Sequence, residues 1–157
     1  MAIRNIRTDG DEVLRKKSRE VDEINEKLIT LLKDMAETMY KSDGEGLAAP
    51  QIGILKRVVV LDVGDGLVEL INPRILQESG EQMEIEGCLS VPGIFGEVKR
   101  PEYIKVEAVN AKGEKFVIEG KELLAICLSH EIDHLDGILF KDKAVRLISK
   151  EELEKRG

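Results

Sequence analysis

Two histidines four positions apart are the residues best suited to chemistry in this chain. Residues 130–134 read His-Glu-Ile-Asp-His. Because residues i and i+4 lie on the same face of a helix, His130 and His134 can reach a single metal ion. Glu131 lies about 100° further around such a helix, where it can contact a metal-bound water without being a ligand. The pattern predicts metal-dependent hydrolysis, in which the metal activates the water and the carboxylate moves its proton.

A catalytic metal of this kind usually has three protein ligands and one water, and the sequence leaves the third ligand open. One class of enzymes with this motif has another His six residues after the second, but this chain has Phe140 there and no third His. Another class uses a more distant Glu, and Glu154 stands 20 residues after His134 in a charged tail. From spacing alone, Cys88 is favoured over Glu154. Cys127 lies in a continuous apolar run, which predicts core or pocket wall.

The helix that carries both histidines is predicted over residues 121–136. Residues 123–128 are apolar on every side, which is typical of a helix buried in the core. Gly137 is a suitable C-terminal stop for this helix. A buried helix that turns polar at His130 needs partners for its polar groups, and a metal centre would supply them.

Two further helices and a set of strands are expected around this helix. A first long helix is predicted over residues 22–42, where apolar residues recur at three- and four-residue spacing after a cap at Asp22 or Asn25. Residues 149–152 fit a capping box that opens a short C-terminal helix. Strands are predicted at residues 57–63, 67–71, 75–77, 94–99, 104–109 and 115–119, with turns at 64–66 and 112–113. Together these elements predict an α+β fold, with mostly antiparallel strands packed around the central helix that bears the HExxH motif.

Composition limits the classes of function. The chain has 157 residues, a length that predicts a single domain over residues 1–157. Its formal net charge is −7 and it has no basic cluster, which argues against direct nucleic-acid binding. No apolar run is long enough to span a membrane, and the N-terminus has no signal-peptide character, so a cytoplasmic location is expected. Two cysteines are too few for a disulfide scaffold.

Three segments resemble the signature motifs of the peptide deformylase family, in the family's order and spacing. They are residues 44–51 (GEGLAAPQ), 86–90 (EGCLS) and 130–135 (HEIDHL). The resemblance implies a hydrolase that removes the formyl group from the N-terminal formyl-methionine of new polypeptides and releases formate. Its partner would be a nascent formyl-methionyl polypeptide emerging from the ribosome.

The resemblance also implies the ligands and the proton carrier. Cys88 would be the third ligand, beside His130 and His134. In this family the metal is typically Fe²⁺, and Zn²⁺, Ni²⁺ or Co²⁺ can occupy the same site. A thiolate ligand is compatible with iron and with zinc. Glu131 would be the general acid/base, which passes the proton of the water to the departing amine.

The same resemblance implies how the substrate is held. Gln51 and the backbone N–H of Leu89 would donate to the formyl oxygen as it becomes an oxyanion. Gly46 would pair with the substrate through its backbone. The methionine pocket would be lined by residues that share the His130 side of the helix, namely Leu123, Ile126 and Cys127.

Two details of the motifs stay open. Position 45 is usually aliphatic in the family, but here it is Glu45, so a charge is expected either at the mouth of the apolar cleft or in solvent. A metal-bound imidazole usually donates to a hydrogen-bond acceptor. Asp133 or Glu86 could be that acceptor, or Glu86 could pair with Arg100.

Two other functions compete with this interpretation. A small zinc peptidase would use Glu154 as the third ligand, and it would keep its metal after alanine replaces Cys88. A non-enzymatic fold with a structural metal would need four protein ligands, and Cys127 is the candidate for the fourth.

Overall fold

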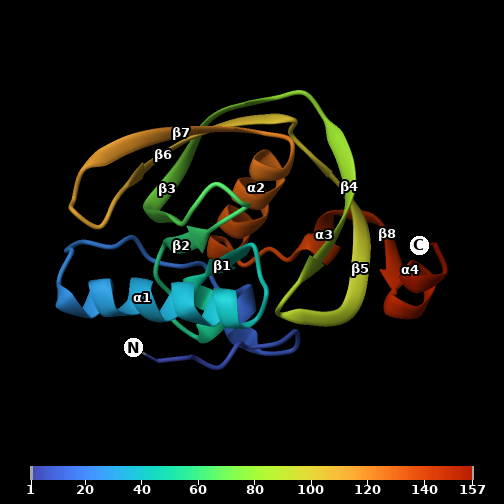
Figure 1. Ribbon diagram of the computed structural model, residues 1–157, viewed down its shortest axis with the longest axis horizontal. Helices are drawn as coiled ribbons and strands as arrows, with labels where there is room; N and C mark the ends of the chain where they lie inside the picture. The colour runs from blue at the N-terminus through green and yellow to red at the C-terminus, as the bar shows by residue number, and fades with distance from the viewer. Residues whose placement is uncertain (1, 157) are drawn as a thin grey trace.

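Two antiparallel sheets lie beside a central helix, α2 (Leu123–Leu135), in the computed structural model, which describes residues 2–156 (Figure 1). One sheet has the strand order β1-β2-β3-β6-β7 and the other β4-β5-β8. The strands are β1 (Gly46–Ala48), β2 (Val58–Leu61), β3 (Val68–Ser79), β4 (Gln82–Cys88), β5 (Val91–Arg100), β6 (Tyr103–Val109), β7 (Lys115–Lys121) and β8 (Ala144–Ser149). The predicted α+β fold, with antiparallel strands around the HExxH helix, is confirmed.

The first helix, α1, begins four residues later than predicted and spans Glu26–Lys41. It begins there because the Asn25 side chain accepts a hydrogen bond from the N–H of Leu28 at 3.0 Å and so caps the first turn. Asp22, the other cap considered, lies outside the helix. The apolar residues that predicted this helix form its buried face, which includes Leu32 and Met35.

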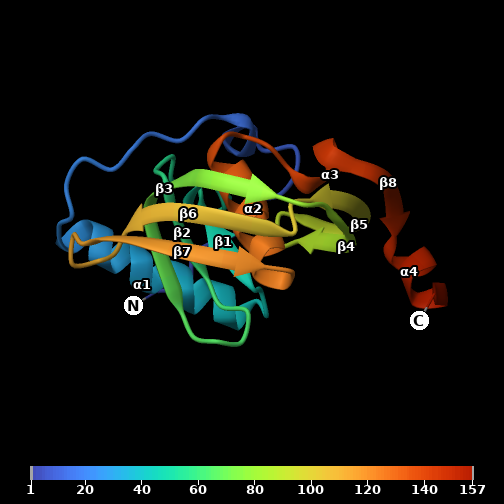
Figure 2. The ribbon, with the colours of Figure 1, turned by 90° about the horizontal axis from the view of Figure 1, so that it is seen from above.

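The five-stranded sheet is covered on both faces near β1 and β2. Val59 and Leu61 pack in the same cluster as α2, whereas Val58 and Val60 pack in the same cluster as α1. Successive residues of a strand point to opposite faces, so the whole of β2 is buried. Figure 1 shows α1 and α2 on opposite sides of β1 and β2, and Figure 2 shows β3, β6 and β7 side by side over α2.

The central helix differs from its prediction at the first turn. Lys121 belongs to β7, and α2 begins at Leu123. Leu123 is 48 % exposed, so the expectation that residues 123–128 are buried all round is wrong at its first residue. The predicted stop is confirmed, since Gly137 has φ +75° and an added Cβ there would lie 2.5 Å from the carbonyl oxygen of Arg15.

The prediction that a strand ends at residues 72–73 is wrong, because β3 continues through them to Ser79. Its pairing with β6 shifts register between Ile71 and Arg74, so Pro73, which has no N–H, lies in an irregularity rather than in a regular ladder. Asn72 has φ +52°, and its side chain exchanges two hydrogen bonds with the backbone of Val21. These bonds hold a conformation that normally ends a strand.

Several other elements were not predicted. They are β1, β4 and β8, the 3₁₀ helices η1 (Glu12–Arg15) and η2 (Ala49–Ile52), and the short helix α3 (Phe140–Lys143). The predicted C-terminal helix is confirmed as α4 (Lys150–Arg156), and the hydroxyl of Ser149 accepts from the N–H of Glu152 at 3.1 Å. Among residues 2–156, no helix is long and apolar enough to cross a membrane.

The N-terminal segment contacts all three motif segments through its backbone. The N–H of Arg7 donates to the carbonyl of Gln51 and the N–H of Asp9 to that of Ser90, each at 2.7 Å. The N–H of Ser18 donates to the carbonyl of Leu135 at 2.8 Å. We call residues 7–18 the N-terminal strap.

Candidate metal centre

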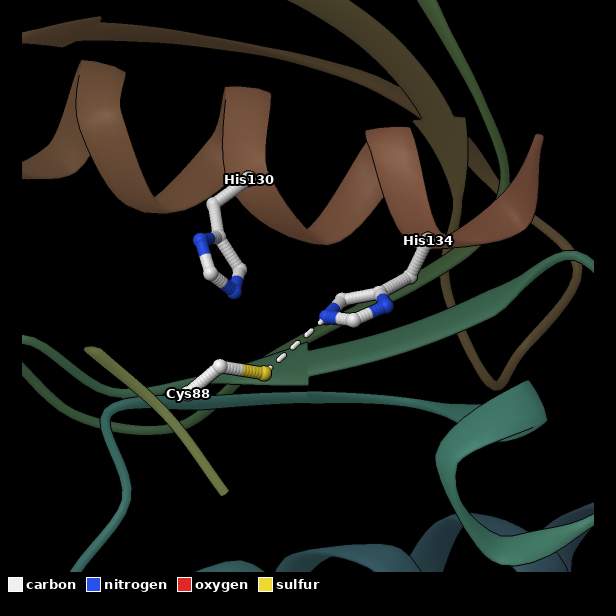
Figure 3. Close-up of side chains that lie close together, drawn as sticks. All are labelled: Cys88, His130 and His134. Atoms are coloured by element: carbon white, nitrogen blue, oxygen red, sulfur yellow. Dashed lines mark hydrogen bonds between the residues drawn. The ribbon is translucent and has the colours of Figure 1, made fainter. Parts of the chain in front are cut away.

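Cys88, His130 and His134 bring their ligand atoms together although they come from two different elements. Cys88 ends β4, and both histidines project from one face of α2 (Figure 3). The three ligand atoms all lie within 4.8 Å of one another, and Cys88 Sγ is 3.4 Å from His134 Nε2. Glu154, by contrast, is exposed on α4 and is not part of this group.

The site fits a divalent metal ion. One thiolate and two imidazoles form a donor set that suits iron or zinc, and three protein ligands leave a fourth position open. Burial lowers the pKa of His134, and the charge of His130 lowers it further, so His134 stays neutral as a ligand must. Beside the ligands, Glu131 is 5 % exposed and its Oε1 has no hydrogen-bond partner among the described residues. A buried carboxylate oxygen without a protein partner is costly unless another group fills the space next to it.

Glu131 is closely confined between α2 and β1. Its Oε2 lies 3.9 Å from His130 Nε2. Burial raises the pKa of the Glu131 carboxyl to about 7, against the opposing effect of His130. On the other side, a Cβ added to Gly46 would lie 2.6 Å from Glu131 Oε2. The carboxylate reaches this position because position 46 has no side chain.

Glu86 is the acceptor for the imidazole of His130. His130 Nδ1 lies 2.8 Å from Glu86 Oε1, which leaves Nε2 for the metal. Two nitrogens of Arg100 donate to the same carboxylate at 2.8 and 3.0 Å. Asp133 accepts from Arg100 at 2.7 Å and from Lys143, and therefore serves the arginine rather than an imidazole. Glu86 therefore has both roles considered for it, as the acceptor for His130 and as the partner of Arg100.

Charge pairing outweighs burial in this network. Burial alone raises the pKa of Glu86, but hydrogen bonds from His130 and Arg100 lower it overall. Burial lowers the pKa of Arg100, and the two carboxylates beside it raise it overall. For His130, burial lowers the pKa, but Glu131, Cys88 and Glu86 together outweigh burial and raise the pKa well above its ordinary value. The network thus keeps the carboxylate charged directly behind a ligand imidazole.

Replacing Arg100 by methionine is expected to lower the free energy of unfolding by about 3–5 kcal/mol, because the buried Glu86 carboxylate would lose its only cationic partner among the described residues and keep just the hydrogen bond with His130. The side chains of Arg100 and Glu86 are only 1 % and 5 % exposed. The matched control is Arg74→Met, whose pair with Glu107 has an arginine that is 71 % exposed and which should cost less than about 1 kcal/mol. Denaturant unfolding of the metal-loaded proteins measures both changes. Similar losses for the two variants would contradict the role given to the buried network.

Gln51 and Leu89 also lie at this centre. Gln51 is in η2 and is 1 % exposed, with its Nε2 3.6 Å from Cys88 Sγ. Leu89 follows Cys88 in the turn between β4 and β5. The Nε2 of Gln51 also donates to the hydroxyl of Ser90 at 3.1 Å. Ser90 is the last residue of the EGCLS segment, but sequence reasoning assigned it no role, because its contact with Gln51 depends on tertiary structure.

A cleft of about 1080 Å³ gathers the other residues that the sequence singled out. Its lining includes the three residues expected to form an apolar pocket, Leu123, Ile126 and Cys127, together with Gly46 and Glu131. Burial raises the pKa of the Cys127 thiol, which makes it a poor fourth ligand because a metal binds the thiolate.

The rim of the cleft is acidic. Glu45 is exposed there, so its charge faces solvent at the cleft mouth. The other exposed acids that line the cleft are Asp43, Glu84, Glu102 and Glu122. The sequence left open whether the Glu45 charge lies at the cleft mouth or in solvent. Each alternative describes Glu45 in part, because the residue lines the cleft and is exposed to solvent.

Comparison with known proteins gives the family. Residues 3–150 match the family described as polypeptide deformylase. The chain belongs to the polypeptide deformylase family. It is 66 % identical to a peptide deformylase of Acetivibrio thermocellus over 156 residues, which cover 99 % of this chain and 92 % of that relative.

Solved deformylase structures share the fold. The crystal structure of the Thermotoga maritima peptide deformylase superimposes with a TM-score of 0.90 at 44 % identity and covers 92 % of this chain and 99 % of that one. The Synechococcus elongatus peptide deformylase in complex with actinonin gives 0.87 at 38 % identity and covers 96 % of this chain and 82 % of that one. The deformylase described here is thus a metal-dependent hydrolase, and Cys88, His130 and His134 form its metal site.

Proposed function

We propose that this deformylase acts on the N-terminal formyl-methionine of newly made polypeptides in the cytoplasm, and that it releases formate and a free amine. The observation that carries the proposal is that the three ligands meet beside the buried Glu131, whose Oε1 has no partner among the described residues, at a cleft that Cys88, His130 and Glu131 line. A hydrolase that acts on an amide needs an activated water and a proton carrier at the same carbon. We expect the substrate to be the nascent chain as it emerges from the ribosome.

Fe²⁺ is the proposed metal, with Zn²⁺, Ni²⁺ or Co²⁺ as alternatives for the same ligands. When bound, the ion would polarise the formyl carbonyl and lower the pKa of water. The Cys88 thiolate and the neutral imidazoles of His130 and His134 would hold it. Glu86 would fix the orientation of His130 through its hydrogen bond to Nδ1.

Glu131 is proposed to move the proton. It would accept a proton from the attacking water and give it to the amine nitrogen as the carbon–nitrogen bond breaks. A pKa of about 7 supports this role, because a general acid/base works best when its pKa is near the pH of the reaction. Its unpartnered Oε1 leaves one oxygen available for that proton.

Gln51 and Leu89 are proposed to stabilise the oxyanion. The Gln51 Nε2 and the backbone N–H of Leu89 would donate to the formyl oxygen as it gains negative charge. A preorganised donor of this kind contributes on the order of 3 kcal/mol to stabilisation of the transition state. The burial of Gln51 supports the role, since a buried donor is not screened by water.

The methionine side chain would occupy the apolar end of the cleft. Leu123, Ile126 and Cys127 line that region beside the ligands. The backbone of Gly46, in the edge strand β1, would pair with the peptide backbone of the substrate, because an edge strand has unpaired N–H and C=O groups.

Gly46→Ala is expected to lower kcat/KM by about 10²-fold, since displacement of a reacting group by about 1 Å has an effect of that size. The new Cβ would lie 2.6 Å from Glu131 Oε2 and would force this confined carboxylate to move. Gly44→Ala is the comparison, because its Cβ would meet the end of the Leu89 side chain, which can move more easily. Steady-state kinetics at equal metal content measures both, and an unimpaired Gly46→Ala enzyme would contradict the close packing of Glu131.

The function is tested with a short formyl-Met peptide and protein prepared without oxygen, loaded in parallel with iron and with nickel. Release of formate and the free amine is the expected result. Mass spectrometry of the products also detects internal peptide cleavage, which a zinc peptidase would give instead. Metal retained without turnover in both preparations would support a structural site and overturn the proposal.

A further inference from the structure

Ser90 is a buried polar residue to which no role has been given. It follows Cys88 and Leu89 in the turn after β4 and is 0 % exposed. Its hydroxyl is neither a metal ligand nor one of the proposed oxyanion donors. Its hydroxyl contacts Gln51, whose Nε2 donates to the hydroxyl oxygen at 3.1 Å.

The carboxamide of Gln51 is held at both ends. Its Oε1 accepts the N–H of Ala48 at 2.9 Å, which determines which end of the amide carries the nitrogen. The nitrogen has two hydrogens. One is directed to Ser90, and the nitrogen also faces Cys88 Sγ at 3.6 Å. With one hydrogen bound to Ser90, the other is directed toward the metal centre.

The N-terminal strap supports both members of this pair from outside. Arg7 donates its N–H to the carbonyl of Gln51, and Asp9 donates its N–H to the carbonyl of Ser90. Two residues of one segment thereby fix the backbones that carry the amide and the hydroxyl. The bonds of the Gln51 side chain to Ala48 and Ser90 hold its rotamer, and a side chain held in this way loses little entropy when it binds.

We propose that Ser90 is a positioning residue for the reaction: its hydroxyl holds the Gln51 carboxamide so that the second N–H, which lies toward Cys88 Sγ, can turn to the formyl oxygen of a bound substrate. The inference rests on the proposed function, because it assigns the support of a donor that the deformylation step uses. Ser90 itself touches neither substrate nor metal in this scheme. Its removal therefore acts through Gln51 alone.

Ser90→Ala is expected to lower kcat about tenfold, the size of one hydrogen bond, with KM changed less than about twofold and metal content unchanged. The matched control is Ser18→Ala. Ser18 is also buried, at 4 % exposed, and its hydroxyl has no partner among residues 2–156. The same atom is thus removed from a similar environment away from Gln51, and kcat should stay within twofold of the parent enzyme.

A double-mutant cycle separates positioning from general destabilisation. In a Gln51→Ala background, Ser90→Ala should lower kcat less than about twofold, because its target has gone. An equal loss of kcat in both backgrounds would overturn the proposal. So would a loss after Ser18→Ala as large as that after Ser90→Ala.

A second measurement does not depend on turnover. In the zinc-loaded protein, the side-chain NH₂ signals of Gln51 can be assigned by their loss in Gln51→Ala. Ser90→Ala should shift this pair of signals and Ser18→Ala should leave it in place. Unshifted signals after Ser90→Ala would overturn the proposal even in an active enzyme, whereas shifted signals without deformylation would indicate failure of the proposed function alone.

Discussion

Cys88→Ala is expected to release the metal, with affinity lowered by more than about 100-fold. Changes to residues that merely support a ligand already cost 10–100-fold in affinity, and this change removes a ligand. Two imidazoles would remain, and two ligands are fewer than catalytic sites of this kind use. Deformylation should fall in proportion to the lost metal. Elemental analysis of dialysed protein, with titration of Zn²⁺ into the apoprotein, measures the change.

Cys127→Ala is the matched control for this prediction. Both residues are free cysteines that line the same cleft, but the thiol of Cys127 contacts the carbonyl of Glu45 at 3.7 Å instead of the histidines. Metal content should therefore be unchanged. Metal kept by Cys88→Ala and lost by Glu154→Ala would instead identify Glu154 as the ligand and favour the peptidase.

Glu131→Gln is expected to keep its metal and to lose about 10²–10⁴-fold in kcat, the usual contribution of general acid–base catalysis. The amide has nearly the shape of the carboxylate, so the packing against Gly46 is kept while the ability to accept a proton is lost. Burial makes replacement by bulk water ineffective, since Glu131 is 5 % exposed. Single-turnover kinetics on a formyl-Met peptide, with metal content measured alongside, gives the result.

Glu154→Gln is the comparison for the same chemical change at an exposed position on α4. Its kcat should equal that of the parent enzyme. If Glu131→Gln turned over substrate at the parent rate with full metal content, the proton would have to move through another group, and the proposed role of Glu131 would be wrong.

Elements with a clear period were predictable. The spacing of apolar residues in α1 and the β-branched run of β2 are properties of the local sequence, and tertiary packing left both intact. The continuation of β3 depends on bonds from the Asn72 side chain to Val21, which no local pattern indicates. Likewise β4 has acids at alternate positions, Glu84 and Glu86, which does not resemble a strand with a buried apolar face. Glu86 is buried there beside Arg100, its partner from β5.

The metal site was predictable in part for the same reason. His130 and His134 share a helix, so their proximity follows from the helical repeat. Cys88 reaches them only through the tertiary placement of β4 beside α2, which is why spacing left it in competition with Glu154. The hydrogen-bond acceptor for His130 also depends on tertiary structure. Asp133 is closer to His130 in sequence, but Glu86 is the residue that contacts its Nδ1. The resemblance to deformylases named Cys88, and the fold supplies the physical reason.

The N-terminal strap has a consequence for how the enzyme matures. Its bonds join Arg7, Asp9 and Ser18 to each of the three motif segments, the last of them near the far end of the chain. Contacts between residues so far apart in the sequence form late, because a long loop must close before each contact can be made. The metal ligands likewise lie on β4 and α2, so the metal site can form only after α2 has been synthesised. A growing chain that has made Cys88 but not yet α2 holds a lone thiol, and the strap can complete its contacts only after the last motif has been synthesised.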